Sequence, residues 1–485
     1  MAFPSKTVTG DTVPLNRSEH GYAAIEGLAG TMVQPYLMRF DTPVSEAQVR
    51  AVLRQLVTAY PRLRAALEPG LHRYHLRILP EGPLIDQMFE LAFRVHTDVN
   101  PDDPEQLQAW HWRALNEVLP LERGLGLRAH FAPHPQRPAL IFGVPHLLAD
   151  GMTMVEQVRQ ILRGLNGLPI EAMPLEAPSM LGSIAPERWW QWPRQVWRSR
   201  QHKVAEARHL ARVHVQQLPT ELGQHYSTTG LRHHTVPTPV ADLRRAARQL
   251  GVSLNTLLVS AIAQTFLDQA PADPQAAAVI RISVNLRKYH PASAGHGPMW
   301  GNHVGAFLVI EQDARKPWAE RVRSVDAAIK EGQARYARRE MCWTYLLEEL
   351  MPLLGRTLVG HLGLKLKRAG RFPAISCHAT SLGDVGGIHP GEVALASVPD
   401  APRVRAIQLV PLVNSISPLP VLVELDGALS APMAWQLGET SPQAVATFHA
   451  RLDATLARLV HEVLGTAAAA AATSSEGAAT VAAAA

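Results

Sequence analysis

Apolar strand patterns alternate with amphipathic helix patterns in both halves of this 485-residue chain. In the first half, an apolar run at 139–144 precedes a stretch whose apolar residues share one helical face. In the second half, Ser253 is placed to cap a helix that precedes another apolar run at 278–285. Such alternation is typical of layered α/β domains, and one hydrophobic core stops growing near about 250–300 residues. The sequence therefore predicts two α/β domains.

Segments rich in Pro, Gly and Ser divide the chain. One such linker covers 166–186, and a second lies near Tyr226. We place an N-terminal domain at residues 1–225 and a C-terminal domain at 226–465. Residues 466–485 are nearly all Ala with Ser, Thr and Gly, so we expect this low-complexity tail to be disordered or weakly helical.

The cysteine content and the hydropathy pattern bear on the compartment. Cys342 and Cys377 are the two cysteines, too few for a disulfide framework or a cysteine-based zinc site. Residues 1–20 show no secretory signal pattern, and no run of about 18 apolar residues occurs. The histidines lack the spacing of metal ligands, so we expect no metal. We expect a cytoplasmic protein, with peripheral attachment to a membrane as an open alternative.

Positive charge and tryptophan gather in residues 187–215. This segment carries seven Lys or Arg against two Glu, and four of the ten tryptophans fall within 189–197. Tryptophan with arginine suits a membrane interface, which makes peripheral membrane contact one hypothesis. Packing of the tryptophans on the first domain and docking of an acidic carrier protein are the alternatives. The basic residues form no continuous stripe, so nucleic acid is not an expected partner.

The motif that bears chemistry is Val144-Pro145-His146-Leu147-Leu148-Ala149-Asp150-Gly151. It places His146 at the end of an apolar strand and Gly151 at the start of a helix. A histidine has a reference pKa of about 6.5 and can accept a proton from an attacking hydroxyl or amine near neutral pH. Asp150 is expected to anchor the loop by pairing with a cation, and Gly151 to allow the sharp exit into the helix. The plainer reading is a histidine in a turn followed by an ordinary Asp-Gly corner.

This motif resembles the His-His-x-x-x-Asp-Gly signature of the coenzyme-A-dependent acyltransferase superfamily. That superfamily includes chloramphenicol acetyltransferase, plant BAHD acyltransferases, condensation domains of nonribosomal peptide synthesis and wax ester synthase/diacylglycerol acyltransferases. Its second histidine is the catalytic one, so the resemblance implies His146 as the general base. Pro145 stands where the first histidine is usual.

Further segments resemble the superfamily in the same order along the chain. The matching stretches are Pro14–Glu19, Val49–Arg64, Ser253–Leu258, Arg281–Arg287, Gly301–Val304 and Thr380–Gly383. The resemblance implies that Arg287 pairs with Asp150. It also implies that Asn302 and Ser381 stabilise an oxyanion or line the acyl channel, although Ser381 stands where asparagine is usual. The implied fold is two chloramphenicol-acetyltransferase-like α/β sandwich domains with a central channel.

The resemblance also implies the reaction. An acyl group would pass from a thioester donor (acyl-CoA or an acyl carrier protein) to a small-molecule or lipid acceptor. The acceptor would present a hydroxyl or an amine, and the product would be an ester or an amide. The thioester is a co-substrate, and no bound cofactor is expected. One alternative is a stand-alone condensation enzyme of natural-product biosynthesis. Another, of a different class, is a non-catalytic homologue that binds acyl thioesters or partners.

Overall fold

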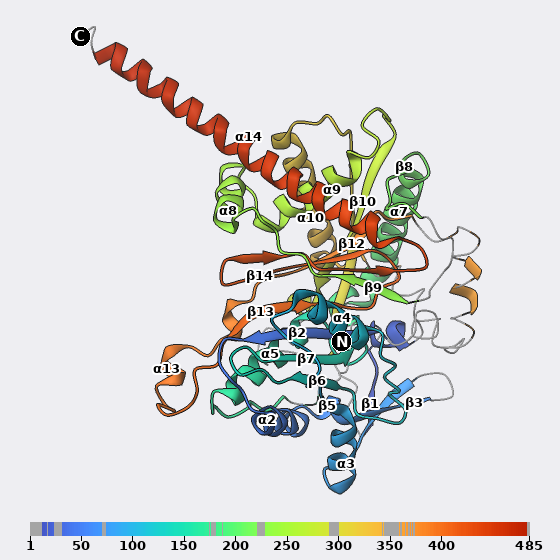
Figure 1. The fold of residues 1–485 in the computed structure, drawn as a ribbon. Coiled ribbons are helices and arrows are strands. Elements are labelled where there is room, and N and C mark those ends of the chain that lie inside the picture. The colour runs from blue at the N-terminus through green and yellow to red at the C-terminus, as the bar shows by residue number, and fades with distance from the viewer. Residues whose placement is uncertain are drawn as a thin grey trace.

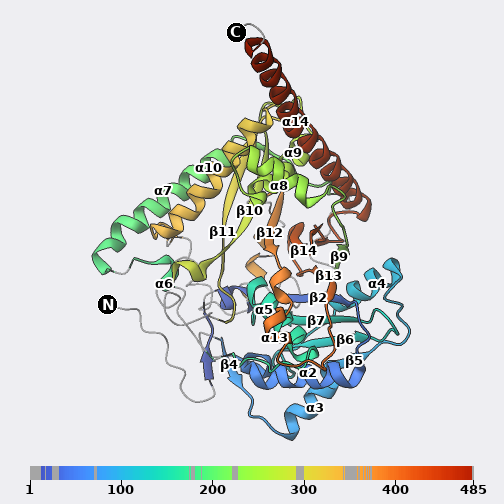
Figure 2. The same cartoon turned by 90° about the vertical axis from the view of Figure 1, so that its left-hand side faces the viewer.

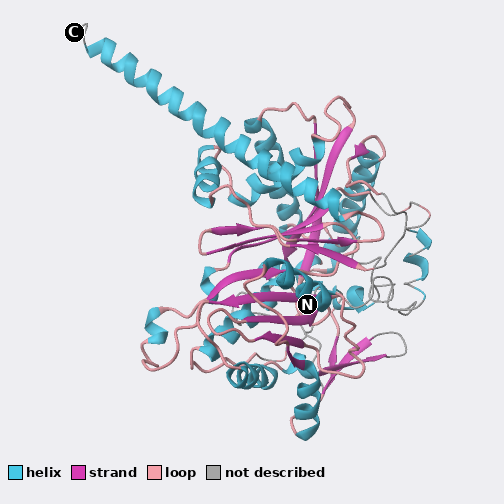
Figure 3. Ribbon diagram, viewed as in Figure 1, coloured by secondary structure: helices cyan, strands magenta, loops and turns pink. Residues whose placement is uncertain are grey.

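The protein consists of two lobes stacked on one another (Figure 1). The computed structural model describes residues 12–16, 18–23, 32–69, 74–173, 175, 181–186, 188–220, 228–290, 300–341, 343, 358, 361–363, 365–366, 369, 371 and 374–482. Strands form the centre of each lobe and helices cover them (Figure 3).

The first lobe is built on a five-stranded sheet with the order β13-β2-β7-β6-β5. Its strands are β2 (Val33–Phe40), β5 (Phe93–Val95), β6 (Arg128–Ala132), β7 (Ala139–Pro145) and β13 (Ala406–Pro411). Every residue of β7 is buried, as expected for a central strand covered on both faces. A smaller sheet, β1-β4-β3, joins β1 (Thr12–Pro14), β4 (Tyr74–Ile78) and β3 (Ala65–Pro69).

Helices cover both faces of this sheet. The main core of the lobe includes the buried side of α2 (Glu46–Ala59) and that of α5 (Gly151–Leu165), which pack on each other. Ser45 caps α2 in a reciprocal capping box with Gln48. On the other face, α4 (Pro104–Leu115) lies between the sheet and the second lobe, where Trp110 joins a separate apolar cluster. The remaining elements of this half are η1 (Pro61–Arg64) and α3 (Pro83–Ala92).

The second lobe is built on an eight-stranded sheet. Its path is β11-β10-β12-β14-β16-β9, with β15 on β14 and β8 on β10. The strands are β8 (His214–Val215), β9 (Thr229–Arg232), β10 (Ala276–Asn285), β11 (Val304–Gln312), β12 (Cys377–Asp384), β14 (Leu419–Leu425), β15 (Ala428–Ser430) and β16 (Met433–Gln436). One face packs against α8 (Val240–Gln249), α9 (Leu254–Leu267), α10 (Trp318–Ala337) and α14 (Pro442–Ala482). Ser253 caps α9 as expected.

The long helix α7 (Trp192–Leu210) and several short elements connect these parts. The short elements are α6 (Leu181–Ile184), η2 (Trp189–Gln191), η3 (Leu286–Tyr289), η5 (Gly386–Ile388) and α13 (Glu392–Leu395). From the sequence we expect one long basic helix over about 187–217; the structure has a helix there with a 3-10 turn before it and a short strand after it. From the sequence we also expect a helix over about 341–368, which lies mostly outside the described residues. The helix α14 runs into the alanine-rich tail, for which we expected disorder or weak helicity; alanine has the highest helix propensity.

The two lobes exchange strands. The late strand β13 pairs antiparallel with β2 and so completes the first sheet, while β8 pairs with β10 in the second sheet. A division at 225/226 therefore does not separate two self-contained sheets, although that boundary itself stays a prediction. Hydrophobic alternation identifies a strand but not the strand beside it, which is why the sequence did not show this exchange.

No single helix among the described ranges is long and apolar enough to cross a bilayer. One sharply bent pair, α8 with α9, passes that test by length and composition only.

Candidate functional site

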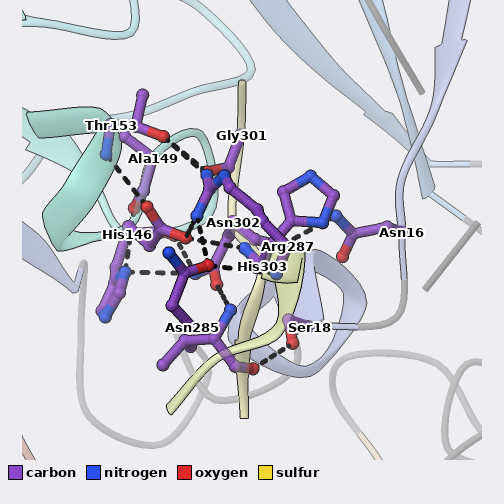
Figure 4. A network of polar contacts seen from close by, with 12 residues as sticks. Asn16, Ser18, His146, Ala149, Thr153, Asn285, Arg287, Gly301, Asn302 and His303 are labelled. Carbon is purple, nitrogen blue, oxygen red and sulfur yellow. Dashed lines mark hydrogen bonds and ion pairs between the residues drawn. The ribbon is translucent and has the colours of Figure 1, made fainter. Parts of the chain in front are cut away.

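His146 follows the last residue of β7, next to the second lobe. Its backbone N–H donates to Met32 O at 2.7 Å, which continues the pairing of β7 with β2. The chain then turns through Leu147–Ala149, all buried, and enters α5 at Asp150. The imidazole is therefore held at the junction of a central strand and a helix (Figure 4).

The hydrogen bonds of His146 define its tautomer. Nδ1 lies 2.9 Å from the carbonyl oxygen of Ala149, which can only accept, so Nδ1 carries the proton. Nε2 then holds a lone pair, and the hydroxyl of Tyr22 lies 3.0 Å from it with the two ring centroids 4.1 Å apart. Burial lowers the pKa of His146, an effect partly offset by the Ala149 carbonyl and the charge of Asp150. The ring is thus neutral, with its basic nitrogen facing a hydroxyl.

Asp150 and Arg287 form a buried ion pair between the lobes, as the resemblance implied. Arg287 Nη1 lies 2.5 Å from Asp150 Oδ2, and the backbone N–H groups of His303 and Thr153 donate to the same carboxylate at 2.8 and 3.0 Å. Burial acts to raise the pKa of Asp150, but Arg287 and these hydrogen bonds lower it to about 2. Arg287 Nη2 also donates to Gly301 O and Thr153 Oγ1, each at 2.9 Å. The carboxylate anchors the loop and does not contact the His146 ring.

Two glycines leave room where the lobes meet. Gly151 is the first residue of α5, and its backbone has no unusual φ; a Cβ there would lie 2.8 Å from Leu382 Cδ2. The prediction that this glycine allows a sharp turn is therefore wrong, because α5 begins directly after its N-cap Asp150. The glycine is needed because a larger residue would clash with Leu382 of β12. Gly301 needs glycine on both grounds, because its φ is +112° and a Cβ would lie 2.9 Å from Glu19 Oε1.

Asn302 is fully buried beside the histidine loop. Its Nδ2 donates to His146 O at 2.7 Å and lies 3.1 Å from Nδ1, which already donates to Ala149. Its backbone carbonyl accepts from Asn16 Nδ2 at 2.8 Å. Because its amide N–H is engaged by the loop, the geometry favours a positioning role, and the oxyanion role stays a prediction.

Ser381 lies in β12, opposite Leu422 of β14. Its side chain is exposed, and a bulge separates it from Gly383. The role of Ser381 in an acyl channel stays a prediction. The central channel itself also stays a prediction, because the Tyr22 ring packs directly against His146.

The site includes residues to which the sequence analysis gave no role. Tyr22 comes from a helical turn at 18–23, and burial raises its pKa to about 12. His378 Nε2 lies 2.9 Å from Ser283 Oγ, and burial, with smaller contributions from Arg281 and His146, lowers its pKa to about 3. No local pattern indicated Tyr22, which meets His146 across 124 positions of sequence. The alternation of apolar and polar residues in β10 could have indicated that Arg281 and Ser283 lie on the face of the strand opposite the core.

The described part of the chain contains no group of three or more His, Cys, Asp or Glu placed to hold a metal ion. Cys377 is buried in the core of the second lobe, where burial raises the pKa of its thiol.

Comparison with known proteins identifies the fold. No family model and no curated protein sequence matches the chain. The trichothecene 15-O-acetyltransferase of Fusarium sporotrichioides is similar in structure, with a TM-score of 0.66 and 10% identity over 94% of this chain and 96% of that one. The first condensation domain of the calcium-dependent antibiotic synthetase, in complex with a substrate analogue, has a TM-score of 0.64 and 16% identity over 94% and 97%.

A third similar structure is the X-domain of teicoplanin biosynthesis in its complex with OxyB. Its TM-score is 0.57, with 16% identity over 95% of this chain and 96% of that one. The chain therefore has the two-lobed α/β fold of condensation domains and of this acetyltransferase. The predicted fold class and the resemblance to the acyltransferase superfamily are confirmed at the level of fold.

Proposed function

We propose that the protein is an acyltransferase that moves an acyl group from a thioester donor to a hydroxyl or amine acceptor. The observation that carries the proposal is the state of His146: Nδ1 is fixed as a donor to Ala149 O, and the Nε2 lone pair faces a hydroxyl at 3.0 Å. That is the geometry a general base needs toward the proton that it removes. The acceptor displaces Tyr22 and takes the place of its hydroxyl.

The reaction then runs in two steps. Nε2 takes the acceptor's proton as its oxygen or nitrogen forms a bond to the thioester carbon, which gives a tetrahedral oxyanion. The oxyanion collapses and the carbon–sulfur bond breaks. The leaving sulfur takes the proton from Nε2 and departs as the free thiol, which restores the neutral imidazole. No acyl-enzyme is required, and Cys377 is buried with a raised thiol pKa. Asp150, Arg287 and Asn302 act by holding the loop that carries His146.

The donor is either acyl-CoA or an acyl group on a carrier protein. The similarity to an O-acetyltransferase and to a condensation domain supports this range of reactions. A stand-alone condensation enzyme is the variant that uses carrier-bound substrates. The complex of the X-domain with OxyB supports the other alternative, a homologue that binds a partner protein.

Thiol release separates these proposals. The purified protein is given acyl-CoAs of several chain lengths with pooled alcohols and amines, and then acyl carrier proteins. Acceptor-dependent release that requires His146 supports the acyltransferase. Absence of release from both kinds of donor, by a folded protein, favours the partner-binding homologue.

A tryptophan-rich surface supports peripheral membrane contact as a further proposal. Trp189, Trp190 and Trp197 are 74%, 56% and 57% exposed, and the Arg188 guanidinium lies 5.3 Å from the ring centre of Trp190. Most of the surface of these rings is therefore open to solvent. The helix α7 lies beside α10 of the second lobe (Figure 2), where Arg198 pairs with Glu340 at 3.0 Å. Flotation with anionic vesicles at low salt tests the proposal, and failure of the protein to float would refute it.

We also propose that the protein is located in the cytoplasm.

A further inference from the structure

In the described part of the chain, the helices α8, α9, α10 and α14 pack on one face of the second-lobe sheet and leave the other face open. In β10, Ile280, Ile282 and Val284 belong to the core under α9, whereas Arg281 and Ser283 point to the opposite face. Pairing places Arg281 beside His378 of β12 on one side and beside Leu308 of β11 on the other. Neighbouring strands therefore bring polar and apolar side chains together on this open face.

The open face leads along β10 toward His146. The face of β10 that carries Arg281 and Ser283 continues to Asn285, which pairs with Val304 of β11. Two residues before Val304, Asn302 Nδ2 donates to His146 O at 2.7 Å. The electrostatic interactions of Arg281 with Tyr22 and His378 agree with this placement. Tyr22 is the residue whose hydroxyl lies 3.0 Å from Nε2. Arg281 is therefore close to the place where the acceptor and the thioester must meet.

The Arg281 side chain is exposed. Among the described residues, none forms an ion pair or hydrogen bond with its guanidinium. The other arginine of this segment, Arg287, is committed to Asp150. His378 is neutral because burial lowers its pKa to about 3, and it contacts Ser283. The fixed positive charge of this face thus comes from Arg281, with Leu308 and Ala306 as partly open apolar neighbours.

We propose that Arg281 is a specificity-determining residue that binds a carboxylate, or a similar anion, carried by a substrate within a few bonds of the reacting atoms. The inference rests on the proposed acyltransferase and names the substrate class of that site. A guanidinium binds a carboxylate through two parallel hydrogen bonds, and an apolar wall with a few placed polar groups is how substrate sites are usually built. The phosphate of a pantetheine donor does not fit this role, because the long arm separates it from the thioester that lies at His146.

The test compares matched acid and neutral substrates in the full chain. For the acceptor, 4-hydroxybutyrate is compared with 1-butanol; for the donor, malonyl-CoA is compared with acetyl-CoA. Wild type is expected to prefer the acid in one of the two pairs. Arg281→Met should lower the kcat/KM ratio of acid to neutral substrate by about 10- to 100-fold, as loss of a hydrogen bond to a charged group implies. The pair that responds shows whether the acceptor or the acyl group carries the anion.

Two variants serve as controls. Arg281→Lys should keep part of the preference for the acid, because lysine retains the positive charge but lacks the planar guanidinium that forms two parallel hydrogen bonds with a carboxylate. Arg248→Met, on an exposed position of α8, should leave the ratio as in wild type. Equal ratios in wild type and Arg281→Met for both pairs would overturn the inference while leaving the acyltransferase intact.

A binding readout separates this inference from the proposed function. Ligand-detected NMR with 4-hydroxybutyrate and with malonate is run on His146→Ala, with and without Arg281→Met. Signals from either acid that depend on Arg281 support the carboxylate site even if no turnover is found. Absence of any such dependence, with both variants folded by circular dichroism, counts against the site.

Discussion

The histidine of this site is oriented by a main-chain carbonyl and not by the motif carboxylate. Ala149 O accepts from Nδ1, while both oxygens of Asp150 are used by Arg287, His303 and Thr153. Asp150 therefore fixes the loop, and its charge reaches the ring only through space. This arrangement leaves His146 neutral and its Nε2 free to act once Tyr22 moves aside.

In the proposed reaction, the Tyr22 hydroxyl competes with the acceptor for Nε2. Tyr22→Phe removes a hydrogen bond with a net value of about 1 kcal/mol, so kcat/KM should rise up to about fivefold. Steady-state kinetics beside wild type would measure the change. A fall of tenfold or more would mean that the hydroxyl takes part in the reaction.

The protonation of His146 sets the acid limb of the pH profile. Burial lowers its pKa below the usual 6.5, and only the neutral ring can accept a proton. We expect kcat/KM to be flat from pH 7 upward and to fall as the pH drops through a value below 6.5. A pH series with a donor stable over the range checks this, and an acid-limb midpoint above 6.5 would contradict it.

At the scale of elements, the β7–α5 loop is held by an ion pair from the other lobe. Asp150→Ala leaves Arg287, 12% exposed, without its partner and should lower the free energy of unfolding by about 3–5 kcal/mol. Urea unfolding followed by circular dichroism measures the change. The folded pKa of about 2 lies below the unfolded value of about 3.9, so the stabilisation is present above pH 3.9 and is lost as the pH falls toward 2. A loss below 1 kcal/mol at pH 7 would show that the pair is not structural.

Alanine substitutions at Gly151 and at Gly301 should lower the stability of the protein by different amounts. In Gly151→Ala the added methyl clashes with the terminal methyl of Leu382, which can turn away, and makes an ordinary contact with the Tyr36 hydroxyl at 3.5 Å. We therefore expect about 1 kcal/mol of destabilisation, relieved in the double variant with Leu382→Ala. Gly301→Ala combines a positive φ with a contact to the buried Glu19–Arg62 pair and should cost about 1–3 kcal/mol more. Thermal unfolding of the three variants tests the order, and equal losses would contradict it.

The elements were largely predictable and their pairing was not. Apolar runs and the Ser253 cap located β7, β10 and the start of α9 to within a few residues, because these signals are local. The resemblance also implied the Asp150–Arg287 pair. The contact of Tyr22 with His146 and the pairing of β13 with β2 escaped prediction, since each joins positions far apart in the chain and leaves no local mark in the sequence.

At the scale of the whole molecule, the site belongs to both lobes. His146 and Asp150 come from the first, whereas Arg287, Asn302 and His378 come from the second, and the exchanged strands β13 and β8 tie the lobes together. Any change in how the lobes meet therefore alters the site itself. The fold alone is compatible with turnover and with partner binding, so chemistry at His146 must decide between them.

The most direct measurement is thiol release by wild type and by His146→Ala, with Arg248→Met as a surface control. We predict acceptor-dependent release by wild type and by the control. Loss of the general base should lower it by about 10²- to 10⁴-fold in His146→Ala. Equal release by a folded His146→Ala would contradict the account.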